Sequence, residues 1–204
     1  YLLDMNDVRM KIENVAFVGS AERDVTAILI DGMAPADSLI GACTFMSVGV
    51  GLDIGGEIPT IRRCIFGDIP AEFGDPLRPG AGIILRANDS MTATGGVIGD
   101  VSNPGQGRND FLETIEGFAV INERTDAILM QNNFWGVTSE DEVLDRVSGP
   151  ATFVPILVSS SAILASSVFC TVWNESDQKR ITDAALDLTV SSYKSITDNT
   201  DGLY

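Results

Sequence analysis

The sequence predicts an all-β protein, a single antiparallel β-sandwich of jelly-roll type over residues 1–204 with one or two short helices. Three observations predict it. Residues 45–54 alternate strictly between apolar and small or polar side chains. Turn-forming residues recur at intervals of about ten residues. A helix start signal stands out at one place, near Ser139.

The strand from Phe45 to Ile54 is the clearest element. Its apolar side chains occupy every second position, whereas a helix would scatter them around its axis. Glycines on the other side of the strand would let a second backbone or a neighbouring subunit approach closely. The apolar positions are Met46, Val48, Val50, Leu52 and Ile54.

Other short apolar runs bounded by turn residues predict further strands, about eight to ten in all. Glu123–Asp126 is predicted to form a hairpin loop between two of them. A helix over Asp110–Ile121 competes with the strand assignment, because Phe111, Ile115 and Phe118 have helical spacing. The predicted strands are Val15–Gly19, Val25–Ile30, Thr60–Phe66, Gly82–Arg86, Phe118–Asn122, Ala127–Gln131 and Leu186–Val190.

One helix of about ten residues is predicted after Thr138. Ser139 and Glu142 have the spacing of a capping box, and the first turn is acidic, as the positive end of a helix favours. Val143, Leu144 and Val147 would form its apolar side. Gly149-Pro150 would end it.

Residues 153–173 carry no charge over a length that could cross a bilayer. Pro155 and several serines argue against a lipid-embedded helix. The segment therefore predicts two buried strands, Thr152–Val158 and Ser167–Trp173, joined by a serine-rich turn. A transmembrane helix remains the alternative.

Net charge excludes several functions. Acidic residues number 29 against 13 basic ones, and the net charge is −16. Such a surface repels nucleic acids and anionic membranes, so we expect no direct nucleic-acid contact. Only Lys11, Lys179 and Lys194 are lysines, and aspartate outnumbers glutamate. This composition is typical of a salt-adapted protein, although an ordinary acidic protein is equally compatible with it.

The residues of common catalytic and metal sites are missing. The chain has no histidine, and its serines lie in no nucleophile motif. Cys43, Cys64 and Cys170 lie in apolar contexts without zinc or redox spacing, so we expect buried thiols, with one disulfide possible. The sequence therefore predicts no enzyme, no catalytic residue, no cofactor and no resident metal.

Two acidic clusters leave a calcium site open. Asp100, Asn103, Asn109 and Asp110 lie in and beside a Gly/Pro loop that could fold around an ion, although the spacing is not that of an EF-hand. Residues 140–145 carry four carboxylates, which the capped helix explains. A solvated acidic loop is the simpler interpretation of the first cluster.

These features predict a protein that acts through its surface. The most concrete hypothesis is a structural, self-assembling capsid subunit of a virion, since jelly rolls are common in capsids. The salt-adapted composition would then point to a virus with a halophilic host. The subunit's partners would be further copies of itself and a second structural protein. The alternatives are an extracellular β-sandwich that binds carbohydrate or calcium and, third, a carboxylate-based hydrolase.

Overall fold

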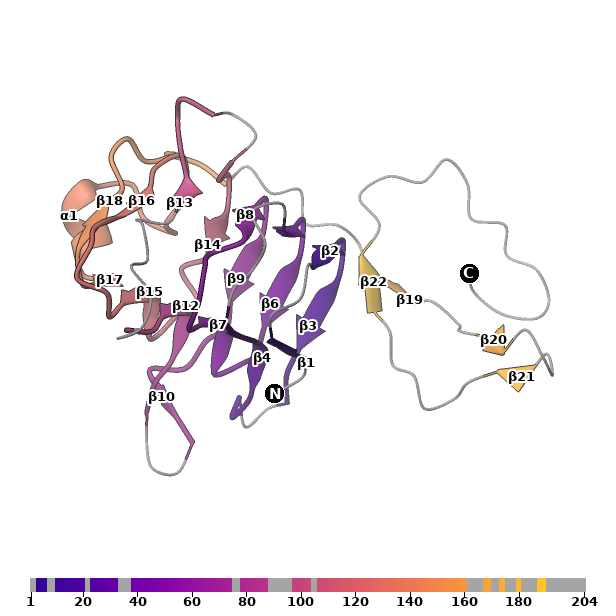
Figure 1. The fold of residues 1–204 in the computed structure, drawn as a ribbon. Helices are drawn as coiled ribbons and strands as arrows, with labels where there is room; N and C mark the ends of the chain where they lie inside the picture. Colours follow the sequence, from indigo (N-terminus) through magenta and orange to yellow (C-terminus); the bar gives the residue numbers. More distant parts are fainter. Residues whose placement is uncertain are drawn as a thin grey trace.

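The chain winds into a parallel β-helix, in which successive coils stack on one another (Figure 1). This computed structural model describes residues 3–6, 10–20, 23–32, 38–74, 78–87, 97–103, 106–160, 167–169, 173–174, 179–180 and 187–189. Each coil contributes a strand to each of three faces, which we call sheets A, B and C. Strands pair with their counterparts in neighbouring coils, and the pairs within all three sheets are parallel.

Sheet A is the longest and has six strands in the order β1-β4-β7-β12-β15-β17. Its register aligns Ile28, Leu52, Ile83 and Val120 in one row, which belongs to the buried core. The strands are β1 (Leu3–Asn6), β4 (Thr26–Asp31), β7 (Val50–Ile54), β12 (Ala81–Leu85), β15 (Phe118–Asn122) and β17 (Val147–Ser148).

Sheets B and C form the other two faces. In sheet B the order is β2-β5-β8, and β13-β16-β18 continues it beside β8. In sheet C the order is β3-β6-β9-β14, and single bridges at Phe134 and Leu157 extend it. The strands are β2 (Lys11–Glu13), β5 (Leu39–Gly41), β8 (Thr60–Arg62), β13 (Val97–Gly99), β16 (Ile128–Met130), β18 (Ala151–Thr152), β3 (Ala16–Val18), β6 (Thr44–Met46), β9 (Ile65–Gly67) and β14 (Asp110–Phe111).

A single residue in the left-handed region turns the chain from sheet B into sheet C. Such a bend redirects the strand sideways rather than reversing it into a hairpin, so the next strand joins another sheet. Two of these residues are asparagine, which tolerates the conformation best among non-glycine residues. The corner residues are Asn14, Ala42, Arg63, Arg108 and Asn132, with φ between 50° and 59°.

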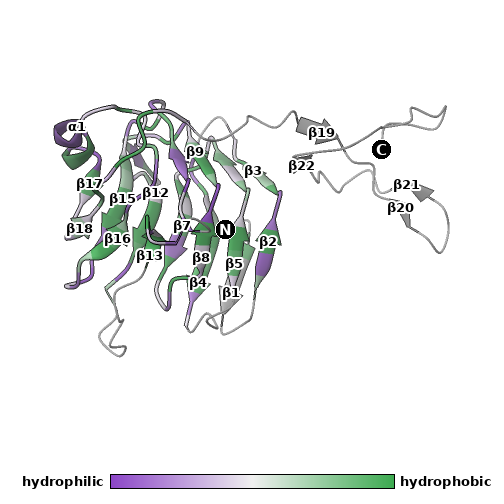
Figure 2. Ribbon diagram, turned by 90° about the horizontal axis from the view of Figure 1, so that it is seen from above, coloured by the Kyte–Doolittle hydropathy of each residue, from purple (hydrophilic) through white to green (hydrophobic). Residues whose placement is uncertain are grey.

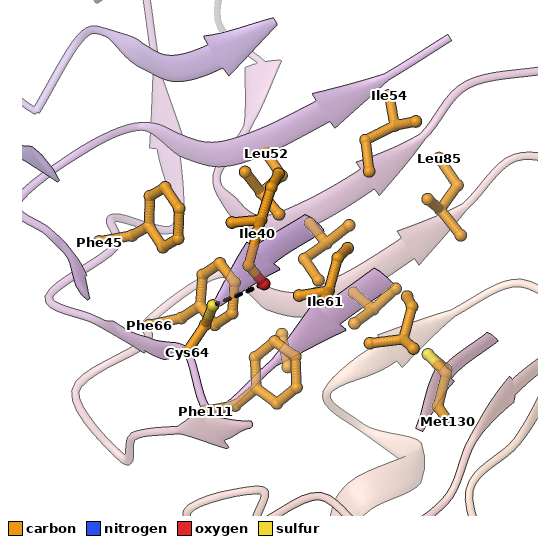
Figure 3. Close-up of a cluster of buried hydrophobic side chains, with 14 of the residues drawn as sticks. Ile40, Phe45, Leu52, Ile54, Ile61, Cys64, Phe66, Leu85, Phe111 and Met130 are labelled. Carbon is orange, nitrogen blue, oxygen red and sulfur yellow. Dashed lines mark hydrogen bonds between the residues drawn. The ribbon is translucent and has the colours of Figure 1, made fainter. Parts of the chain in front are cut away.

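Stacked aromatic rings fill much of the interior. Phe17, Phe45, Phe66 and Phe111 follow one another on sheet C, with ring centroids 4.9–5.1 Å apart and nearly parallel planes. Trp135 continues the column 4.9 Å from Phe111. This separation matches the spacing of neighbouring strands, so identical positions in successive coils stack ring on ring. Aliphatic side chains of sheets A and B pack against the column (Figure 3).

The predicted antiparallel sandwich is wrong. Strand positions were largely predictable, but neighbouring segments pair in parallel across coils. The predicted strand Phe45–Ile54 is two strands, β6 and β7, separated by a corner at Ser47 with φ of 54°. The predicted hairpin at Glu123–Asp126 is another corner, since β15 belongs to sheet A and β16 to sheet B. The alternative helix over Asp110–Ile121 is also wrong, because that segment contains β14 and β15.

The predicted helix is present but shorter. Helix α1 (Glu140–Leu144) begins at Ser139 with a complete capping box and ends at Asp145. Val143 is buried in the core, whereas Val147 lies in β17. Figure 2 shows α1, hydrophilic in its first part and hydrophobic in its last, at the end of the coil opposite β2 and β3.

Short antiparallel pairs complete the described structure. A hairpin of β10 (Glu72–Phe73) and β11 (Arg78–Pro79) precedes β12. In the C-terminal part β19 (Ser167–Phe169) pairs with β22 (Asp187–Thr189), and β20 (Trp173–Asn174) with β21 (Lys179–Arg180). β22 lies beside β3 (Figure 1).

The uncharged stretch 153–173 is partly described. Its first part, up to residue 160, runs past β18 and bridges to sheet C at Leu157, and β19 falls inside the second predicted strand. Residues 161–166 and 170–172 of the stretch, including Cys170, lie outside the described residues. Within the described ranges, no helix is long and apolar enough to span a bilayer.

Candidate functional site

Three charged side chains meet at the C-terminal ends of the sheet A strands. Arg86 directly follows β12, and its Nε donates to Oδ1 of Asp53 on β7 at 2.5 Å. Its Nη2 also donates to Oδ1 of Asp31 on β4. Arg86 therefore joins strands from three successive coils of sheet A.

Gly55 makes this arrangement possible. It lies between Asp31 and Arg86, and a Cβ there would stand 2.8 Å from Nη2 of Arg86 and 2.9 Å from Oδ1 of Asp31. The absence of a side chain lets the ion pair cross the intervening coil.

The three groups differ in exposure and in pKa. The side chain of Asp53 is 10% exposed, against 35% for Arg86 and 44% for Asp31. Burial raises the pKa of Asp53, and the positive charge of Arg86 opposes that shift without cancelling it. Burial also opposes the charge on Arg86, but hydrogen bonds and charges from Asp31 and Asp53 raise the pKa of its guanidinium.

Two further arginines bind the main chain. Arg124 is buried and donates to the carbonyl oxygens of Arg86, Ile54 and Gly56. Arg146 donates to the carbonyl oxygens of Trp135, Leu112 and Ile115. Burial lowers the pKa of both guanidinium groups. These side chains satisfy carbonyl groups where the strands end, which is a structural role.

A polar column lines the corner between sheets B and C. Asn109 is buried: its Oδ1 accepts from the backbone N–H of Cys64 at 2.9 Å, and its Nδ2 donates to the carbonyl oxygens of Ile61 and Ile98. Asn133 occupies the same place one coil further and accepts from the backbone and amide of Asn109. These amides hold coils together and are committed to the chain itself.

The end of the coil formed by β1, β2 and β3 is different, because each of these strands is an edge strand of its sheet. Its inward-pointing side chains Leu3, Ile12 and Phe17 pack on the core but are only partly buried. At the opposite end Val143 of α1 is fully buried.

Two opposite charges lie on the edge strand β2. Nζ of Lys11 is 2.9 Å from Oε2 of Glu13, and Nη2 of Arg62 is 3.3 Å from Oε1 of Glu13. The hydrogen bond from Lys11, assisted by Arg62, lowers the pKa of Glu13. The outer surface of β2 therefore carries one positive and one negative side chain.

The suspected calcium ligands do not form one site. Oδ1 of Asp100 accepts from the backbone N–H of Ser102 at 2.7 Å, and Asn103 is in the same turn. Asn109 points into the coil, and Asp110 is buried on β14 and accepts from Ser160 Oγ. Among the side chains that the structure describes, no group of three or more His, Cys, Asp or Glu could hold a metal ion.

Sequence reasoning missed the cluster of Asp31, Asp53 and Arg86. These residues are far apart in the chain, and only knowledge of the coil register places them together. A signal for that register exists: Ile40-x-x-Cys43-x-Phe45 recurs as Ile61-x-x-Cys64-x-Phe66. Loops of different length separate the other coils, so the repeat has no fixed period.

Comparisons with known proteins place the chain in no family. No family model, no curated protein and no solved structure matches it.

Proposed function

We propose that this chain is a structural protein that acts by contact and assembles in two-fold pairs through the end of the coil at β2. The carrying observation is that β2 is an edge strand with complementary charges at alternate positions, Lys11 and Glu13. An edge strand is a template for pairing with another chain.

The backbone of β2 supports an antiparallel contact with a second copy. Met10 O accepts from Leu39 N at 2.9 Å, and Asn14 N donates to Gly41 O at 3.1 Å. Because hydrogen-bonding direction alternates along a strand, the backbone groups of Lys11 and Glu13 point away from β5.

A two-fold axis at Ile12 would place Lys11 opposite Glu13 of the second copy. These two residues would then form a hydrogen-bonded antiparallel pair, with their opposite charges facing each other twice. Such a self-complementary pattern is what a two-fold contact requires. The same contact would cover partly buried apolar side chains of the first coil, among them Ile12.

The remaining chemistry of the described residues favours a structural role. Arg124, Arg146 and Asn109 bind main-chain groups, and Arg86 is shared by two carboxylates. The interior is filled by stacked side chains. A capsid role depended on a jelly roll, and a parallel β-helix offers no such link, so a place in a virion stays a prediction. The expectations about a second structural protein and the absence of enzyme activity also stay predictions.

Sedimentation equilibrium tests the proposal. The 204-residue chain should form a dimer, and Lys11→Glu or Glu13→Lys should each yield a folded monomer, because like charges would face each other. An equimolar mixture of the two variants should recover the dimer. One copy would then carry glutamate at positions 11 and 13, and the other copy would carry lysine at both positions. The control is Arg63→Glu, which reverses an exposed charge at the corner after β8 and should leave the dimer intact.

Two results would refute this function: a wild-type chain that stays monomeric at all salt and protein concentrations, or a Lys11→Glu chain that dimerises as well as the wild type. Circular dichroism of each variant separates loss of contact from loss of fold.

Binding of a hydroxyl-rich ligand such as a carbohydrate is a second candidate. The observation in its favour is that Asp31 and Arg86 are partly exposed beside the buried Asp53. The carboxylate of Asp31 and the guanidinium of Arg86 thus offer planar hydrogen-bond acceptors and donors on the face of sheet A. Calorimetric titration with a panel of oligosaccharides, with Arg86→Ala as the comparison, tests it. Binding that Arg86→Ala weakens at least tenfold would support this candidate, and the absence of binding to every oligosaccharide would remove it.

A further inference from the structure

Cys43 and Cys64 lie next to each other in adjacent coils. Register pairs Gly41 with Arg62 and Thr44 with Ile65, so the two cysteines occupy equivalent places between these pairs. Neighbouring strands are about 4.8 Å apart, which lies inside the Cα separation that a disulfide accepts. Both cysteines are buried free thiols in the structure.

We propose that Cys43 and Cys64 form a disulfide that locks the second and third coils together under oxidising conditions. The backbone on both sides of the pair is already fixed: Ala42 N donates to Arg62 O at 2.9 Å, and Ile65 N donates to Cys43 O at 2.8 Å. Cross-linking therefore requires little movement of the main chain.

Loss of the two S–H groups would leave no strong hydrogen bond unmade. Sγ of Cys43 donates to Gly41 O at 3.3 Å, and Sγ of Cys64 donates to Arg62 O at 3.4 Å. Each of these carbonyls also accepts a backbone bond, Gly41 O from Asn14 N and Arg62 O from Ala42 N. A thiol is a weak donor, so the carbonyls keep their principal partners. Figure 3 shows the further contact of Cys64 Sγ with Ile40 O, at 3.6 Å.

Electrostatics favour Cys43 as the attacking group. A hydrogen bond from Cys64 lowers the pKa of the Cys43 thiol, whereas burial raises that of Cys64. The oxidant is a small disulfide such as oxidised glutathione. The Cys43 thiolate attacks one of its sulfurs and expels one glutathione thiolate, which takes up the proton that Cys43 lost.

The second step closes the bond. Cys64, after losing its proton, attacks the Cys43 sulfur of the mixed disulfide and expels the second glutathione. Two protein thiols and one small disulfide thus give one protein disulfide and two small thiols. Because both cysteines are buried, the exchange proceeds during folding or during transient opening of the coil.

The experiment is refolding of the full chain in a buffer of reduced and oxidised glutathione, followed by intact mass and peptide mapping. The expected product lacks two hydrogens and links the peptide with Cys43 to the peptide with Cys64. Its melting temperature should fall when a reductant is added.

Cysteine variants that preserve packing separate loss of the cross-link from loss of the fold. Cys43→Val and Cys64→Val are tolerable replacements because Val15 holds the equivalent place in the first coil. Either should abolish both the cross-link and the reductant-sensitive melting shift, whereas Cys170→Ser should preserve both. Recovery of free thiols at Cys43 and Cys64 in the refolded protein would overturn the proposal, as would a cross-link from either one to Cys170.

Discussion

Arg86 binds Asp31 across a whole intervening coil, and Gly55 is the residue that leaves the path open. This relationship ties three coils of sheet A together at their strand ends. The next residue, Gly56, is also a glycine, but for another reason: a Cβ there would meet the main chain of Gly32. The two positions should therefore differ in their tolerance of a side chain.

Gly55→Ala should destabilise the chain by about 1 kcal/mol, because the new Cβ meets only the mobile ends of Arg86 and Asp31, in a partly exposed ion pair. Gly56→Ala should cost about 3 kcal/mol or more, because its Cβ would overlap the main-chain carbonyl of Gly32. Urea unfolding of both variants checks the order. Equal effects would mean that the two glycines do not differ as described.

Asn109→Ala should cost about 2–5 kcal/mol. The change leaves the buried N–H of Cys64 and the carbonyl of Ile61 without their amide partner. Asp126→Ala, at an exposed position in another turn, is the control and should change the free energy of unfolding by less than about 0.5 kcal/mol. Chemical denaturation measures the free energy of unfolding of both variants. An Asn109→Ala chain as stable as the control would contradict the stabilising role of the buried Asn109 amide.

The position of a phenylalanine in the aromatic column should set its contribution. Phe66 is fully buried between Phe45 and Phe111, at 4.9 Å and 5.0 Å, so Phe66→Ala should cost about 3–5 kcal/mol. Phe17 is only partly buried and stacks on Phe45 at the end of the column. Phe17→Ala should cost roughly half as much. Thermal unfolding gives the comparison, and a larger loss for Phe17→Ala would be inconsistent with this packing.

Asp53 should make stability fall as pH rises. Burial raises the pKa of Asp53 in the folded chain, so the folded state keeps its proton to a higher pH than the unfolded chain does. Between the ordinary value of about 3.9 and the raised value, the folded state binds more protons and loses stability with increasing pH.

Asp53→Asn removes that proton-binding difference. The stability of this variant relative to the wild type should therefore increase as pH rises through the same window. Urea midpoints measured for both chains over a pH series check the sign. A relative stability that decreases with pH would show that Arg86 outweighs burial at this carboxylate.

Salt should stabilise the fold. A net charge of −16 opposes compaction through repulsion between carboxylates. Arg124 and Arg146 hydrogen-bond to main-chain carbonyl oxygens rather than to carboxylates, so they relieve little of this repulsion. Screening by sodium chloride relaxes the remaining repulsion. The urea midpoint should rise with chloride concentration, and a midpoint that falls would exclude salt adaptation.

Sequence patterns located most strands but not their partners. Phe118–Asn122 coincides with β15, and Val25–Ile30 overlaps β4. Alternation reveals that a segment is extended and has a buried side, but it carries no information on the direction of the neighbouring strand. The parallel coil depends on the corners between strands. At Ala42 and Arg63 a residue without any turn preference adopts a positive φ, so no local signal marked those corners.

The helix was the easiest element to predict because its determinants are local. Ser139 and Glu142 form both hydrogen bonds of the capping box. Its length was overestimated, since Val147 was assigned to the helix on spacing alone and instead joins β17 beside Val120. The cluster around Arg86 depends on contacts between distant coils, and only the register reveals it.

Hydrogen–deuterium exchange at low and high protein concentration tests the proposed contact most directly. The backbone amides of Lys11 and Glu13 face away from β5, whereas that of Ile12 faces β5. If two copies pair through β2, exchange at Lys11 and Glu13 should slow as concentration rises, while Ile12 exchanges slowly throughout. Exchange at Lys11 and Glu13 that does not depend on concentration, or protection that appears only at α1, would contradict it.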